Sequence, residues 1–185
     1  MKSFILTLFI SLCYSFTYSQ SIEINYSDGS TKLFPEDYRY YGPDLNSKFP
    51  LMNYVDIYGD SITNDEIDNK IVLINIWSIG CTGCKLEEPF LKNLTTKYQN
   101  SEKVEFISIC TNSDRAARNY YKKNGDFGYR TLSLTRKEIK EIFKSVATPT
   151  HFIVNKGKLL HNFTIPVALD VTYNWVDDKI DELIR

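Results

Sequence analysis

The stretch IVLINIWSIGCTGCKLEEPFLKNL, residues 71–94, decides the fold of this chain. Residues 71–77 are apolar except for Asn75, and such a run is typical of a strand covered on both faces. After Cys84 the apolar residues follow a helical period, and Pro89 is expected to kink the helix because it lacks an N–H. The apolar stripe of this helix is Leu86, Phe90, Leu91, Leu94 and Tyr98. A buried strand therefore leads into a helix through two cysteines.

The rest of the chain repeats this alternation of strand and helix. Ser113 can cap one helix, and Thr135 with Glu138 has the spacing of a capping box. In chain order we predict a hairpin at 49–58 and 61–63, a strand at 104–110, a helix at 113–123, a strand at 129–134, a helix at 135–145, a hairpin at 151–154 and 159–163, and a helix from 170. This order predicts an α/β fold with a mixed β-sheet between helices.

Length and composition fit one domain with an extension. The chain has 185 residues, of which 43% are hydrophobic, enough to build a core. The formal net charge of −1 gives no reason to expect nucleic acid as a partner. We predict a domain over residues 48–185, preceded by a polar, tyrosine-rich lead-in over 20–47 with one or two short strands.

Residues 1–19 have the pattern of a secretory signal peptide. Lys2 supplies a positive start, an apolar run extends from Phe4 to Leu12, and small residues would suit cleavage after Ser19. The apolar run is shorter than the roughly 20 residues of a membrane span, although an uncleaved anchor remains an alternative. Leu12 fits poorly before a lipid-modified Cys13. The expected location is extracytoplasmic, periplasmic or associated with the cell envelope.

Three cysteines remain once the signal is set aside. Cys110 ends an apolar strand and is expected to be a buried core residue. Cys81 and Cys84 form a CxxC pair at the start of a helix, where free N–H groups and the helix dipole favour a thiolate. Cys81 is therefore the expected nucleophile and Cys84 the resolving thiol. A zinc half-site is the alternative, but no second ligand pair has suitable spacing, so we expect neither metal nor cofactor.

Two segments resemble the TlpA/ResA-like thiol–disulfide oxidoreductases of the thioredoxin superfamily. The first is residues 75–89, which carry an aromatic residue four before the first cysteine, the CxxC pair, and a K-x-E-x-P continuation. The second is ATPTHFIVNKGK, residues 147–158. The resemblance spans residues 48–184 and implies a thioredoxin-like fold with an N-terminal β-hairpin extension.

The resemblance also implies the rest of the site. Trp77, Thr148 and Pro149 would bind substrate, with a cis bond between Thr148 and Pro149. Glu87 would be a buried catalytic group that takes the proton from Cys84. In thioredoxin an Asp on the preceding strand has this task, and the matching residue here is Asn75, which cannot titrate. A surface Glu beside Lys85 is the alternative reading of Glu87.

This chain differs from the family pattern at two places beside the cysteines, and the role of one histidine has two interpretations. The pair Thr82-Gly83 lacks the proline often found between the cysteines, so the redox potential cannot be read from it. Gly80 replaces a bulky residue and would leave the first thiol more open. His151 would either tune the thiols or be a satisfied core residue.

The function implied is that of an exported thiol–disulfide oxidoreductase. Its expected partners are exported proteins with paired cysteines, including apocytochromes c, and a membrane electron donor, and a monomer is expected. Two alternatives are weighed. A peroxidase lacks its PxxxTxxC motif around Cys81 or Cys110, and a copper-binding protein would typically carry CxxxC.

Overall fold

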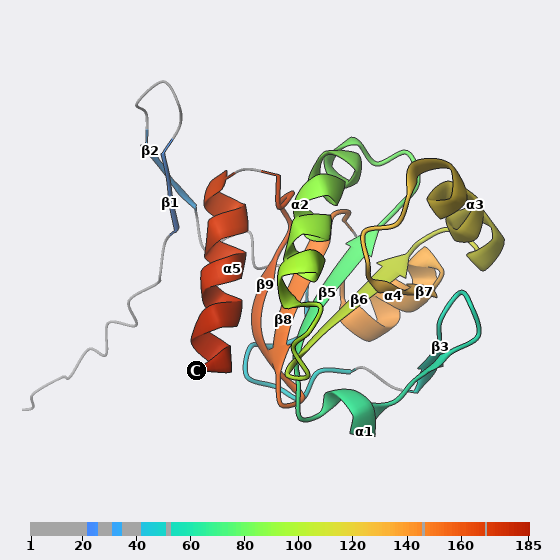
Figure 1. Cartoon of the computed structure of the whole chain (residues 1–185), viewed down its shortest axis with the longest axis horizontal. Coiled ribbons are helices and arrows are strands. Elements are labelled where there is room, and N and C mark those ends of the chain that lie inside the picture. The colour runs from blue at the N-terminus through green and yellow to red at the C-terminus, as the bar shows by residue number, and fades with distance from the viewer. Residues whose placement is uncertain (1–21, 26–30, 35–41, 51–52, 146, 169) are drawn as a thin grey trace, which may run out of the picture.

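The structure is a computed structural model that describes residues 22–25, 31–34, 42–50, 53–145, 147–168 and 170–185 (Figure 1). The predicted signal peptide at 1–19 and the predicted turn at Asp28-Gly29 lie outside these residues and stay predictions. Among the described residues, no helix has both the length and the apolarity to cross a membrane.

A five-stranded mixed sheet forms the centre of the molecule. Its strands are β5 (Ile71–Trp77), β6 (Val104–Cys110), β7 (Arg130–Ser133), β8 (Thr150–Asn155) and β9 (Lys158–Phe163). In the order β7-β6-β5-β8-β9, the first three strands are parallel, and β8 is antiparallel to both β5 and β9. Every residue of β5 is buried, as expected for a strand with a helical layer on each face. The predicted mixed sheet is confirmed.

Helices cover both faces of this sheet. The helices are α1 (Asn64–Ile67), α2 (Thr82–Tyr98), α3 (Asp114–Asn124), α4 (Arg136–Phe143) and α5 (Asp170–Ile184). Residues of α2, α3 and α5 share a core cluster with Leu73 and Trp77. Residues of α1 and α4 share the opposite cluster with Val72 and Ile74. Figure 1 shows α2 and α5 lying across the same face.

Local signals set the helix starts as predicted. The Ser113 hydroxyl accepts from the backbone N–H of Ala116, and Thr135 and Glu138 form a complete capping box. The helix α2 runs through Pro89 without a break. One detail of the predicted stripe was wrong: Leu86 is 60% exposed. The buried residue at that turn is Glu87, because the helix is rotated to bring its carboxyl inward.

The chain before β5 contributes two small hairpins and α1. The strands β1 (Ile22–Asn25) and β2 (Thr31–Phe34) pair antiparallel within the lead-in, as do β3 (Tyr54–Val55) and β4 (Ser61–Ile62) after it. The second hairpin is shorter than predicted. The Asp56 carboxylate accepts from the N–H groups of Tyr58 and Asp60, so the turn starts at Asp56. The short helix α1 was not predicted from the sequence.

Candidate active site

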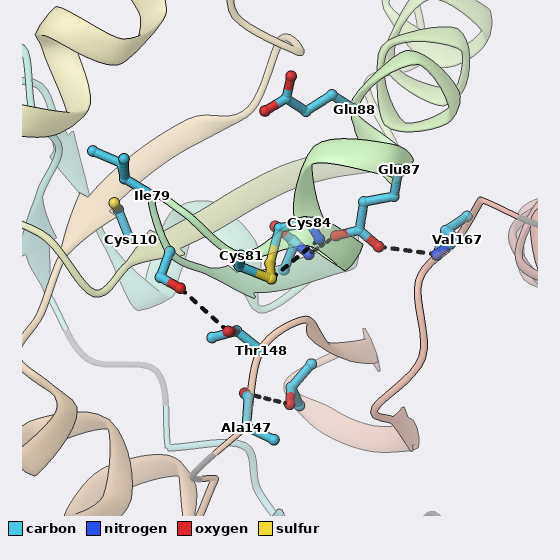
Figure 2. Close-up of a disulfide and its surroundings, with 12 residues drawn as sticks. Ile79, Cys81, Cys84, Glu87, Glu88, Cys110, Ala147, Thr148 and Val167 are labelled. Carbon is cyan, nitrogen blue, oxygen red and sulfur yellow. Dashed lines mark hydrogen bonds between the residues drawn. A yellow bond between two sulfur atoms is a disulfide. The ribbon is translucent and has the colours of Figure 1, made fainter.

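The cysteines lie where β5 passes into α2 (Figure 2). Cys81 is the N-cap of α2, and its sulfur forms a disulfide with that of Cys84, with the two Cα atoms 5.3 Å apart. The Cys84 backbone N–H points at the Cys81 sulfur, 3.1 Å away. Cys84 is 4% exposed, whereas Cys81 is partly exposed. An incoming group therefore meets Cys81 first.

The turn before the disulfide depends on Gly80. Its φ of +89° is costly for any residue with a side chain, and no atom lies within 4 Å of the place where a Cβ would be. The Cys81 N–H donates to the Ser78 carbonyl oxygen across this turn. The backbone conformation, and not a lack of space, therefore favours glycine here.

The second segment of the site reaches the disulfide from the start of β8. The peptide bond between Thr148 and Pro149 is cis. The hydroxyls of Thr148 and Ser78 lie 3.3 Å apart. A Cβ on Gly83 would lie 3.2 Å from Pro149 and 3.0 Å from Pro166. Gly83 thus allows two prolines to approach the residues between the cysteines.

Glu87 lies one turn after Cys84 and is fully buried. Its Oε1 accepts from the Asn75 side-chain amide at 2.9 Å, and its Oε2 lies 2.9 Å from the Val167 backbone N–H. The His151 Nε2 is 3.0 Å from the same Oε2. Figure 2 shows the carboxylate reaching toward Val167. The alternative interpretation, in which Glu87 is a surface residue beside Lys85, is therefore excluded.

His151 enters this cluster through the strand register. It pairs with Asn75 across β8 and β5, so both side chains emerge on the same face of the sheet. Its Nδ1 is 3.4 Å from the Asn75 amide nitrogen, and its ring stacks on Phe163 with centroids 4.7 Å apart. His151 is only two residues after Pro149 in the sequence, but the strand register is what pairs it with Asn75.

Trp77 does not take the place expected for a substrate-binding side chain. It is 2% exposed, and its indole N–H donates to the Ser108 hydroxyl at 3.2 Å. Its ring packs against Tyr120, Tyr121 and Phe127. So covered a ring offers almost no surface to a substrate, and the prediction is corrected: Trp77 supports the site from within the core.

Two exposed apolar side chains near the cysteines were not anticipated as site residues. Ile79, in the turn, is 37% exposed, and Leu86, at the start of α2, is 60% exposed. An isoleucine in a turn beside a CxxC pair was the available signal. Ile79, two residues before the partly exposed Cys81, offers apolar contact area beside it.

Cys110 has the properties of a core residue. It is fully buried at the end of β6, and burial raises the pKa of its thiol to about 11. Among the described residues, no group of three or more His, Cys, Asp or Glu side chains is placed to hold a metal ion.

Comparison with known proteins agrees with this geometry. The AhpC/TSA family pattern matches residues 45–162. The chain is 26% identical over 119 residues to the thiol-disulfide oxidoreductase ResA of Bacillus thuringiensis, covering 63% of this chain and 68% of that protein.

Solved structures share the fold at low sequence identity. A putative thiol:disulfide interchange protein DsbE from Chlorobium tepidum superposes with a TM-score of 0.67 at 13% identity, over 77% of this chain and 99% of that one. A secreted Mycobacterium tuberculosis disulfide oxidoreductase superposes with a TM-score of 0.59 at 16% identity, over 72% and 97%.

A thioredoxin-like fold with a CxxC disulfide capping its central helix defines a class, the thiol–disulfide oxidoreductases, and the chain is an enzyme of this class. More specifically, the chain belongs to the AhpC/TSA family, as a TlpA/ResA-like member of the thioredoxin superfamily.

Proposed function

We propose that the chain is exported and reduces disulfides of extracytoplasmic proteins through the Cys81–Cys84 dithiol. The observation that carries the proposal is the position of Cys81 as the N-cap of α2, partly exposed and bonded to a covered Cys84. A helix N-terminus stabilises a thiolate, which is the attacking form in thiol–disulfide exchange.

The first step forms a mixed disulfide. The Cys81 thiolate attacks one sulfur of the substrate disulfide, the substrate S–S bond breaks, and the other substrate sulfur leaves as a thiolate that takes up a proton. The Cys81 lone pair forms the new S–S bond, and the bonding pair of the broken bond leaves with the departing sulfur.

The second step needs a base for Cys84. Glu87 is buried on the same side of α2 one turn later, and we assign it to take the Cys84 proton. The Cys84 thiolate then attacks the Cys81 sulfur, the intramolecular disulfide forms, and the substrate leaves as its second thiolate.

Substrate binding is assigned to the segment Thr148-Pro149. It lies beside Gly83 and offers backbone groups to an extended peptide. Ile79 would add an apolar contact at the rim.

Export and partners complete the proposal. The pattern of residues 1–19 and the secreted M. tuberculosis neighbour support an extracytoplasmic location. A reductase in an oxidising compartment needs a supply of electrons, and we assign this to a membrane donor. Apocytochromes c are candidate substrates, and the enzyme would act as a monomer with residues 20–47 as an extension of the domain at 48–185.

A redox titration tests the proposal. Protein equilibrated in dithiothreitol buffers, alkylated and weighed by mass spectrometry should show one two-electron couple that disappears in Cys81→Ser and Cys84→Ser. Insulin reduction should disappear with it. Stoichiometric tight copper binding without turnover would favour the copper-binding alternative instead.

Replacing Glu87 with Gln tests the base. The amide keeps the size of the side chain but takes no proton, so resolution at neutral pH should slow about 10²-fold. Glu88→Gln, one residue on, is the matched control. An unchanged pH profile in Glu87→Gln would argue against the assignment.

A peroxidase is the second candidate because of the family pattern. A peroxidatic cysteine must be a thiolate within reach of peroxide. Cys110 is buried with a raised pKa, and Cys81 already has Cys84 as its disulfide partner, so the site favours disulfide exchange.

A further inference from the structure

Asn75, Glu87 and His151 form a buried hydrogen-bonded cluster below the disulfide, and it contains a histidine that disulfide exchange alone does not require. We propose that His151 is a positioning residue for the resolving step: it holds the Glu87 carboxylate in place and shares with it the proton released by Cys84. The inference rests on the proposed function, in which Glu87 is the base.

The contacts of His151 define its resting state. The Asn75 amide nitrogen can only donate, so the His151 Nδ1 that faces it is an acceptor without a proton. The proton of the neutral ring is then on Nε2, which donates to Glu87. The ring thus supports an ionised Glu87 and still has one nitrogen that can bind a further proton.

Glu87 needs this support because it is fully buried. A buried carboxylate is costly unless donors surround it. Three donors do so, from Asn75, His151 and the Val167 backbone. Of these three, only His151 can itself gain or lose a proton, and this makes it the partner suited to sharing one.

Asn75 can adapt to the added proton. Within the described part of the chain, its buried carbonyl oxygen has no hydrogen-bond partner. Rotation of the amide by half a turn would present that oxygen to a protonated Glu87 or to a proton on His151 Nδ1. The oxygen that has no partner in the resting cluster would then accept a hydrogen bond, so the cluster can accommodate the added proton.

Among the groups around the cluster, Cys84 is the one suited to exchange a proton with it. On α2 the titratable residue one helical turn before Glu87 is Cys84. From β5 the neighbour of His151 is the neutral Asn75, and from β9 it is the apolar Phe163. Tyr129 also interacts electrostatically with Glu87. Burial, and to a smaller extent the charge of Glu87, raise the pKa of Tyr129 well above its usual value, so Tyr129 remains a neutral phenol.

The resolving step couples a proton transfer to thiol–disulfide exchange. Cys84 gives its proton to the Glu87–His151 pair, and its thiolate forms the bond to the Cys81 sulfur. The bond between Cys81 and the substrate breaks, and the leaving substrate thiolate takes a proton. The pair then returns its own proton to solvent, which restores the resting cluster.

A double-mutant cycle tests this coupling. Resolution of a preformed mixed disulfide between Cys81 and a peptide thiol is followed by acid quench and mass spectrometry at several pH values. His151→Gln can still donate one hydrogen bond but binds no proton, and it should slow resolution about tenfold at pH 7 and alter the pH profile. In Glu87→Gln protein the same change should have no further effect.

The other histidine provides the control. The His161 ring contacts Trp175, with centroids 5.1 Å apart. His161→Gln should resolve at the wild-type rate with the wild-type pH profile. Equal and additive slowing by His151→Gln with and without Glu87→Gln would overturn the inference.

A measurement on the unaltered protein covers the case in which His151→Gln does not fold. Nitrogen-15 NMR of the histidine rings in the reduced protein should show His151 changing protonation with the midpoint pH of Cys84, and this change should vanish in Cys84→Ser. A His151 signal that ignores Cys84 would overturn the inference. Loss of the two-electron couple in the wild type would instead reject the proposed function, so the two failures are distinguishable.

Discussion

Two neighbouring parallel strands, β5 and β6, end at the same edge of the sheet and are each followed by a capped helix, yet only one carries a reactive sulfur. After β5 the N-cap is Cys81, and after β6 it is Ser113. Cys110 is still within β6, paired with Trp77 in the register. Burial raises the pKa of Cys110, whereas Cys81 is partly exposed at a helix N-terminus. The position of a cysteine relative to the helix end, over a few residues, thus decides its chemistry.

The largest expected effect separates the two strand ends directly. Cys84→Ser removes the resolving sulfur, so substrate should stay bound to Cys81 and release should slow at least about 10³-fold. Peptide mapping by mass spectrometry locates the trapped substrate. Cys110→Ser serves as the control and should turn over like the wild type. Substrate trapped on Cys110 would break the comparison.

The next test moves a thiol to the other cap. Ser113→Cys places a cysteine at the exposed N-cap of α3, and its alkylation at pH 7 should be on the order of 10²-fold faster than that of Cys110. Site-resolved mass spectrometry in protein with the Cys81–Cys84 disulfide intact measures both rates. Equal rates would mean that the position of the cap has no influence.

Gly83 and Arg115 occupy the same position, two residues after the N-cap, in α2 and α3. Gly83→Val would press on Pro149 and Pro166, and should lower the free energy of unfolding by about 1–3 kcal/mol. Arg115 is exposed, and Arg115→Val should change it by less than about 0.5 kcal/mol. Urea denaturation measures both, and equal losses would contradict the close packing around Gly83.

The last effect concerns the stability of the folded protein at alkaline pH, far from the pH at which the enzyme would act. The Cys110 pKa is raised from 9.0 to about 11, so the folded protein retains a proton that the unfolded chain loses. The resulting stabilisation is complete below pH 9 and is lost as the pH rises through 9 to 11, by at most about 2.7 kcal/mol. In Cys110→Ala the decline over this window should be smaller by that amount. Parallel curves for the two proteins would contradict a raised pKa.

Much of the fold could be predicted because its signals are local. The apolar runs of β5 and β6, the cap at Ser113 and the capping box at Thr135 each lie within a few consecutive residues. Short-range physics acts on such neighbours whatever the rest of the chain does. The segment α1 was missed because a single turn of helix has too few residues to show a period.

The burial of individual side chains was harder to predict. Leu86 and Glu87 are adjacent. The hydrophobicity of their side chains would predict a buried leucine and an exposed glutamate, yet Leu86 is exposed and Glu87 is buried. Trp77, which was predicted to contact substrate, is buried in the core as well. The packing of the whole helix decides which face of α2 meets the sheet. The hydrogen bonds that Glu87 receives from residues beneath α2 offset the cost of burying its carboxylate.

The sequence by itself determined the strand, the turn and the helix that present Cys81 and Cys84, because these are properties of a continuous segment. Only the tertiary structure decided that Asn75, Glu87 and His151 meet beneath them. Asn75 and His151 are 76 positions apart, and they become neighbours through the antiparallel register of β5 and β8. A register shift of one residue would turn His151 to the other face of the sheet, so this cluster depends on long-range pairing that no local pattern encodes.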